Sequence, residues 1–105
     1  MRFLRRQQAI MTSKQRAYLR GLANGADTIL TVGKNGINHN VSAETDAALE
    51  AHELIKGRVL ENSPISAREA AEALAEENRA EVVQVIGTRF VLYRPSKKPV
   101  ITLPQ

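Results

Sequence analysis

Segments typical of helices and of strands alternate along this chain, and their order constrains the fold more than any other feature. Thr12-Ser-Lys-Gln15 has the pattern of a capping box and predicts a helix that runs to about Asn24. Residues 28–32 (TILTV) form a short segment rich in β-branched residues, as in a buried strand. Asn38 is a candidate N-cap for a second helix, to about His52. The first half of the chain therefore predicts helix, strand, helix.

The alternation continues in the second half. Residues 53–61 (ELIKGRVLE) predict a strand in which Lys56 and Arg58 lie on one face. Ser66-Ala-Arg-Glu69 is a second capping box, and it opens an alanine-rich helix to about Glu77. Asn78 is the expected left-handed residue that ends this helix.

A strand pair completes the pattern. Residues 81–86 and 89–94 are both rich in β-branched and aromatic residues, and Gly87-Thr88 between them suits a type II′ hairpin. The predicted order is α-β-α-β-α-β-β. We therefore expect the α/β (α+β) class: a single domain in which a mixed four-stranded sheet packs with three helices.

The length of 105 residues allows one hydrophobic core. We expect a flexible N-terminal extension over residues 1–10, the folded domain over 11–97 and an extended, partly mobile C-terminal tail over 98–105. The extension has arginines but no continuous apolar segment, so it does not resemble a secretory signal.

Several classes of function are disfavoured by composition. The sequence has no cysteine, which removes disulfides and thiolate zinc sites and favours a cytoplasmic location. No apolar run approaches the roughly 20 residues of a membrane helix. His39 and His52 lack the spacing of a metal site. We expect a monomer with no cofactor, no metal and no membrane partner.

Charge is unevenly distributed along the chain. Residues 1–26 carry six bases and no acid, and residues 87–105 carry four bases and no acid. All eleven acids fall between Asp27 and Glu81, where only five bases lie. If the two ends meet in space, one face is strongly basic, as expected for a partner rich in phosphate.

The loop Gly33-Lys34-Asn35-Gly36 is the strongest candidate site. It follows a predicted strand and precedes a predicted helix, and its two glycines let backbone amides approach a ligand closely. The next helix offers free N–H groups and the positive end of its dipole. Lys34 adds a positive charge at the tip. This combination suits a nucleic-acid backbone, as in the Gly-X-X-Gly loop of KH domains, although such a glycine pair is often only a turn.

Further basic residues are candidate RNA contacts with open alternatives. On the first helix, Arg16 and Arg20 are four residues apart and either contact phosphates or simply solvate a helix face. On the strands, basic side chains either form a basic sheet face or pair with acids of neighbouring strands. Arg89 and Arg94 point to opposite faces, so at most one joins a given surface. The complete set outside the loop is Lys14, Arg16, Arg20, Lys56, Arg58, Arg89 and Arg94.

Three segments together resemble one known family. The family is YhbY/CRM (chloroplast RNA splicing and ribosome maturation), and the segments that resemble it are Val32-Gly-Lys-Asn-Gly-Ile-Asn38, Leu49-Glu-Ala-His-Glu-Leu-Ile-Lys56 and Ala80-Glu-Val-Val-Gln-Val-Ile-Gly87. The last of these runs into Phe90-Val-Leu-Tyr-Arg94. The resemblance covers roughly residues 11–94. It implies three helices on a four-stranded sheet and an RNA-contacting loop at residues 33–36. The family often has glycine where Asn35 stands, a mild departure because asparagine tolerates left-handed conformations.

The resemblance also implies a function. Bacterial stand-alone members of the family look like single RNA-binding domains associated with precursors of the large ribosomal subunit. We therefore expect a binding protein for ribosomal RNA, and the alternative is an adaptor that binds a ribosomal protein within the same particle. We do not expect an enzyme, because acids such as Glu44, Asp46 and Glu50 are spaced like a solvated helix face and have no histidine or lysine as partner.

Overall fold

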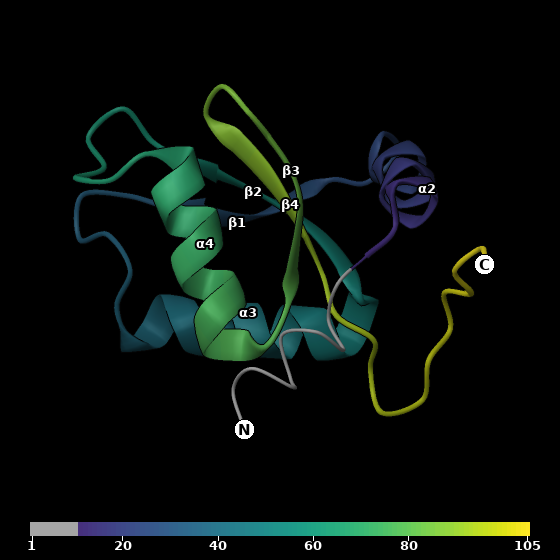
Figure 1. Ribbon diagram of the computed structural model, residues 1–105. Helices are drawn as coiled ribbons and strands as arrows, with labels where there is room; N and C mark the ends of the chain where they lie inside the picture. Colours follow the sequence, from purple (N-terminus) through teal and green to yellow (C-terminus); the bar gives the residue numbers. More distant parts are fainter. Residues whose placement is uncertain (1–10) are drawn as a thin grey trace.

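The structure is a computed structural model that describes residues 11–105. The expected N-terminal extension, residues 1–10, lies outside the described residues. Seven elements follow one another in the predicted order (Figure 1). They are α2 (Ser13–Ala23), β1 (Thr28–Val32), α3 (His39–His52), β2 (Leu54–Val59), α4 (Ala67–Asn78), β3 (Glu81–Ile86) and β4 (Arg89–Tyr93).

The four strands form one mixed sheet in the order β1-β2-β4-β3. Strand β1 is parallel to β2, while β4 is antiparallel to both of its neighbours. A parallel pair needs a crossover connection, which α3 supplies, and the tight β3–β4 turn forms the hairpin. The predicted fold class, three helices with a mixed four-stranded sheet, is confirmed.

Both predicted capping boxes are present. The Thr12 hydroxyl accepts from the N–H of Gln15 at 3.0 Å, and the Gln15 side chain accepts from the N–H of Thr12 at 3.2 Å. Ser66 and Glu69 make the same reciprocal pair at the start of α4. These bonds satisfy N–H groups that a helix start would otherwise leave without partners, so they define where both helices begin.

The end of α4 differs from the prediction by one residue. Asn78 is the last helical residue, and Arg79 adopts the left-handed conformation with φ 57°. Asn78 is buried, and its side-chain amide donates to the Leu74 carbonyl at 3.0 Å. Because this side chain is satisfied inside the helix, the left-handed residue moves to the next position.

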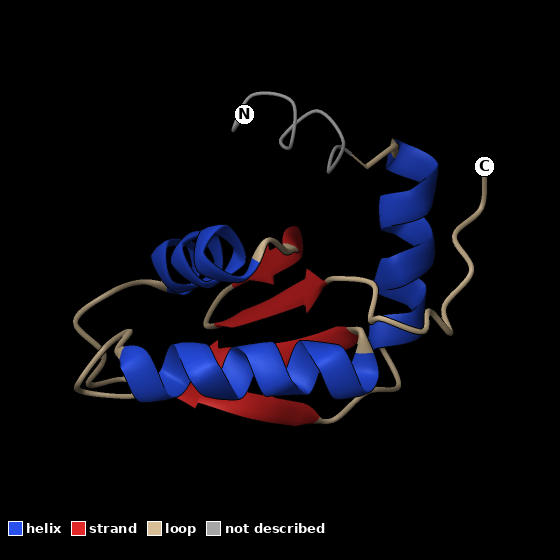
Figure 2. Ribbon diagram, turned by 90° about the horizontal axis from the view of Figure 1, so that it is seen from below, coloured by secondary structure: helices blue, strands red, loops and turns tan. Residues whose placement is uncertain are grey.

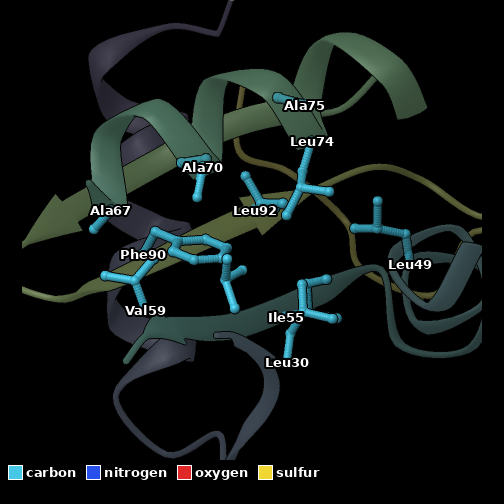
Figure 3. Close-up of a cluster of buried hydrophobic side chains, with 12 residues drawn as sticks. Leu30, Leu49, Ile55, Val59, Ala67, Ala70, Leu74, Ala75, Phe90 and Leu92 are labelled. Atoms are coloured by element: carbon cyan, nitrogen blue, oxygen red, sulfur yellow. The ribbon is translucent and has the colours of Figure 1, made fainter. Parts of the chain in front are cut away.

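The main core lies between the sheet and the pair α3 and α4. Leu30, Ile55, Phe90 and Leu92 from the strands meet Leu49 of α3 and the alanines and Leu74 of α4 (Figure 3). Small alanine side chains allow α4 to approach the sheet closely. Gly57 contributes in the same way, because a Cβ at this position would lie 2.4 Å from Cζ of Phe90 on the neighbouring strand.

Helix α2 packs on the opposite face of the sheet and covers only one end of it. Leu19 and Ala23 are buried against Val83, Val91 and Tyr93. In Figures 1 and 2, α2 stands apart from α3 and α4, and the C-terminal tail runs beside it. Within residues 11–105, no helix covers the rest of this sheet face, which leaves a surface for the candidate site.

The tail after β4 lacks regular secondary structure, and it is attached to the domain. Ile101 and Leu103 pack against the α2 cluster, and the Gln15 amide donates to the Pro104 carbonyl at 3.1 Å. The two ends of the described chain therefore meet at α2. The sequence did not indicate this attachment, which depends on apolar side chains that meet only in the folded chain.

The buried carboxylate of Glu53 holds the start of the tail. It accepts bonds from the N–H and hydroxyl of Ser96 at 2.8 and 2.9 Å, and from the N–H groups of Val100 and Ile101 at 3.1 and 2.8 Å. Burial by itself raises the pKa of Glu53, but these hydrogen bonds outweigh it and lower the pKa to about 2. Burial and the nearby Glu53 charge raise the pKa of Tyr93.

Candidate nucleic-acid interface

Three connections gather at the end of the sheet that α2 leaves open. They are the loop 33–36 after β1, the segment 60–66 after β2 and the hairpin turn 87–88. The Val32 carbonyl accepts from the N–H of Leu60 at 2.8 Å, and the N–H of Val59 donates to the Thr88 carbonyl at 2.8 Å. These bonds place the ends of β1 and β2 beside the hairpin turn (Figure 1). The candidate loop and the basic strand residues near it therefore belong to one region.

The Gly33–Gly36 loop is a tight turn closed by a bond from the N–H of Gly36 to the Gly33 carbonyl at 3.0 Å. Lys34 and Asn35 at its tip are exposed. Within residues 11–105, neither of their backbone N–H groups has an acceptor in the protein. Two N–H groups and one ammonium group are thus available to an anionic ligand at the same tip.

The two glycines of the loop meet different demands. Gly36 has φ +62°, and a Cβ there would lie 3.2 Å from Cγ of Pro64, so the fold itself requires glycine. At Gly33 a Cβ would meet only Leu60, at an ordinary 3.6 Å, and φ is not left-handed. Asn35 also has no positive φ, so its place in the turn does not depend on tolerance of a left-handed conformation.

The start of α3 follows directly after the loop. The Asn38 side chain caps it by accepting from the N–H of Val41 at 2.9 Å, as predicted. No acid occupies its first turn. The positive end of the helix dipole is therefore not offset by a neighbouring carboxylate on the same helix.

The open face of the sheet carries most of the predicted strand cations. Thr31, Arg58, Arg89 and Ile86 form one row across the four strands, each opposite the next in register. Lys56, Val91 and Gln84 form the next row toward α2. Lys56, Arg58 and Arg89 thus lie together on one face, and we call them the basic triad.

Arg58 and Arg89 are direct cross-strand partners on β2 and β4. Like charges in this arrangement destabilise a sheet unless other groups neutralise them. In the part of the chain that the structure describes, no ion pair joins any member of the basic triad to an acid. The alternative that these bases pair with acids of neighbouring strands is therefore not realised. An external anion placed here would relieve the repulsion.

The candidates on α2 have separate environments. The Arg16 guanidinium donates to the carbonyl of Val82 and, at 3.4 Å, to that of Val83, where β3 departs from regular pairing with β4. This contact attaches α2 to the sheet. The Lys14 ammonium donates to the Gln105 carbonyl at 3.1 Å. Arg20 is half-buried one turn after Arg16 on the same flank, and it has no such bond within the described residues.

Arg94, a candidate contact by its sequence, is engaged inside the protein. Its guanidinium lies 2.8 Å from the Asp46 carboxylate and 3.7 Å from that of Glu50, and it donates to the Asn78 carbonyl at 3.0 Å. Its side chain is 17% exposed. Arg94 therefore joins the second half of α3 to the end of α4 at the end of β4 far from the hairpin turn, and it does not share the face of Arg89.

Gln84 and Ile86 also lie on the open face, although no sequence pattern singles them out. Register shifts between Val82 and Gln84, so strict alternation fails in β3. Val83 packs against α2, while Gln84 and Ile86 lie on the same face beyond it. The bulge cannot be predicted from the sequence alone, because the residues around it are ordinary strand residues.

The described residues contain neither a metal-binding cluster nor a membrane helix. Over residues 11–105, no three histidine, aspartate or glutamate side chains lie close enough to hold a metal ion. No helix in this part of the chain has the length and apolar character needed to cross a bilayer.

Comparisons with known proteins agree on one family. The model of the CRS1 / YhbY (CRM) domain matches residues 11–94. The chain is 43% identical over 89 residues to the Probable RNA-binding protein YqeI of Bacillus subtilis (strain 168), covering 85% of this chain and 93% of that protein. It is 38% identical over 95 residues to an RNA-binding protein of Haemophilus influenzae, covering 90% of this chain and 96% of the relative.

A solved structure supports the same assignment. The solution structure of the hypothetical protein SAV1595 from Staphylococcus aureus superposes with a TM-score of 0.76 at 48% identity, covering 90% of this chain and all of the other. The fold and the open basic face thus define a small α/β domain with a cationic surface. The chain belongs to the CRS1/YhbY (CRM) domain family.

Proposed function

We propose that this chain is a monomeric cytoplasmic RNA-binding protein whose target is ribosomal RNA in the precursor of the large ribosomal subunit. The proposed activity is binding, without catalysis, cofactor or metal. One observation carries the proposal: Arg58 and Arg89 face each other on an open sheet without an acidic partner in residues 11–105. The oxygens of a phosphate match the fork of N–H donors that a guanidinium group presents.

The geometry supports contact with a polyanion rather than a single small anion. The loop with Lys34 lies at the same end of the sheet as Arg58 and Arg89, and Lys56 extends the cations toward α2. A nucleic-acid backbone presents charges in series, so it can meet the loop and the basic triad together. Arg16 and Arg94 are not part of this interface, because their guanidinium groups hold the fold together.

The relatives support RNA as the polymer. The matched proteins of Bacillus subtilis and Haemophilus influenzae are both named RNA-binding proteins. The ribosomal target rests on the resemblance to bacterial members of the family that associate with large-subunit precursors.

A pair of matched double variants tests the interface. Arg58→Gln with Arg89→Gln removes two charges from the open face, whereas Arg68→Gln with Arg79→Gln removes two exposed charges from α4 and its cap. We expect only the first to weaken binding to a large-subunit ribosomal RNA fragment in a fluorescence anisotropy titration. Removal of each phosphate contact should also reduce the log–log salt slope by about 0.7–0.9. Equal weakening by both variants would show general charge attraction and overturn the proposed interface.

The loop provides a second arm of the same experiment. Lys34→Asp with Asn35→Asp places two negative charges at the exposed tip and leaves both glycines unchanged. We expect a large loss of affinity with an unchanged melting temperature. A variant that folds and binds like the parent would show that the loop is only a turn. Binding that requires a ribosomal protein in every titration would instead favour the adaptor alternative.

A further inference from the structure

A hollow lies on the open face of the sheet beside the basic triad. Its volume is about 190 Å³, and its lining residues come from β2, β3 and β4. They are Lys56, Gln84, Ile86, Arg89, Phe90 and Val91. The bulge in β3 shapes this hollow, because it brings Val83 under α2 and leaves Gln84 and Ile86 uncovered.

The chemistry of the lining is mixed in a specific way. Val91 is buried and supplies an apolar floor, and Ile86 adds an apolar side chain that is 63% exposed. Phe90 borders the hollow, but its side chain packs in the core on the other face of the sheet. Lys56 and Arg89 line the hollow as cations without acidic partners in the described chain. Gln84 adds one amide, which both donates and accepts hydrogen bonds.

This combination matches one nucleotide of a single strand better than a paired helix. A hollow of this size is comparable to the ~150 Å³ cavity that holds a benzene ring in an engineered protein, so a flat ring fits. Bases in a duplex are stacked and paired, and they cannot enter a hollow on a protein surface unless they are splayed out. The flanking phosphates of an unpaired base would meet the two lining cations.

We propose that this hollow binds one unpaired nucleobase of the RNA, and this inference rests on the proposed function. The base lies against Ile86 and Val91, and the Arg89 guanidinium stacks on it or contacts its phosphate. Arg89 takes the role that aromatic side chains have on many RNA-binding sheets. Here the aromatic residues of β4, Phe90 and Tyr93, are buried in the two cores and cannot serve. The Gln84 amide then meets an edge of the base.

The test compares two RNA hairpins with the same stem. One carries a single bulged 2-aminopurine nucleotide, and the other is fully paired. We expect the parent protein to bind the bulged hairpin more tightly and to change the 2-aminopurine fluorescence. Ile86→Ala should reduce this preference by about fivefold, the lower end of what stacking of one base contributes. Ile29→Ala is the matched control, because Ile29 of β1 is a 48% exposed strand isoleucine that does not line the hollow.

The outcomes separate the two proposals. Equal affinity of the parent for both hairpins, with a steep salt slope, would overturn the base-binding hollow and leave the proposed RNA interface standing. Absence of binding to either hairpin and to ribosomal RNA would overturn both. An unchanged preference in Ile86→Ala and also in Gln84→Ala, with normal melting temperatures, would show that the hollow is not the base site. It would then be a surface for another partner, such as a protein side chain.

Discussion

Replacing Glu53 with glutamine should destabilise the fold strongly at neutral pH and hardly at all in acid. The carboxylate accepts four hydrogen-bond donors from the tail, from Ser96, Val100 and Ile101. Glutamine keeps one acceptor oxygen but turns an NH₂ group toward these donors, so some of them lose their partner. Buried groups left unsatisfied in this way are costly.

The magnitude follows from the pKa. The folded-state pKa of Glu53 is about 2, against its usual 4.5, so the ionised form is stabilised by folding. This difference sets an upper limit of about 3 kcal/mol at neutral pH. The tail residues over the carboxylate are themselves partly exposed, and solvent screening reduces the value, so we expect a decrease of about 2 kcal/mol in the free energy of unfolding.

The pH dependence has a definite sign. Because the folded pKa is the lower one, the stabilisation is fully present above pH 4.5 and is lost as the pH falls toward 2. Urea unfolding of the parent and of Glu53→Gln at several pH values should show a difference in unfolding free energy that shrinks to near zero as the pH falls from 4.5 to 2. Glu61→Gln, an exposed change on the segment after β2, should stay within about 0.5 kcal/mol of the parent throughout. Equal unfolding free energies of the parent and the variant at pH 7, or a difference that does not change with pH, would refute the reasoning.

Two further predictions concern packing and the role of α2. Gly57→Ala should lower the unfolding free energy by about 2 kcal/mol in urea titrations, because its Cβ would fall within 3.1 Å of three Phe90 ring atoms; an unaffected variant would mean that the ring moves freely. Arg16→Ala should cost about 1–3 kcal/mol of stability, because it leaves the Val82 carbonyl without this donor, and it should leave RNA affinity nearly unchanged. Arg20→Ala is its control, with little expected effect on stability. An Arg16 variant that is as stable as the parent but binds RNA poorly would show that Arg16 contacts the RNA.

Local signals in the sequence predicted most of the fold. The capping boxes at Thr12 and Ser66 and the N-cap at Asn38 gave the helix starts correctly, because side-chain to backbone bonds within one turn decide them. Strand bounds were within about two residues, since β-branched runs and the Gly87-Thr88 turn mark them.

The remaining features depend on contacts between distant segments. Which arginines are engaged in the fold could not be predicted, because the partners of Arg16 and Arg94 lie 66 and 48 residues away in the chain. The anchored tail depends on Glu53, which the sequence presents as an ordinary acid at the start of a predicted strand. The hollow beside Gln84 depends on a bulge, and its position follows from pairing with β4 rather than from β3 alone.

The placement of α2 also has a consequence for the time course of synthesis. Leu19 and Ala23 emerge early from the ribosome, but the residues that cover them, Val83, Val91 and Tyr93, are made about 70 residues later. At the ~5–20 residues per second of protein synthesis, the apolar side of this helix stays exposed for about 4–14 s until β3 and β4 have been synthesised. During that interval the helix is marginal by itself, since isolated helices of this length are barely stable in water. We therefore expect residues 13–23 of the nascent chain to resist proteolysis only after β4 has left the exit tunnel.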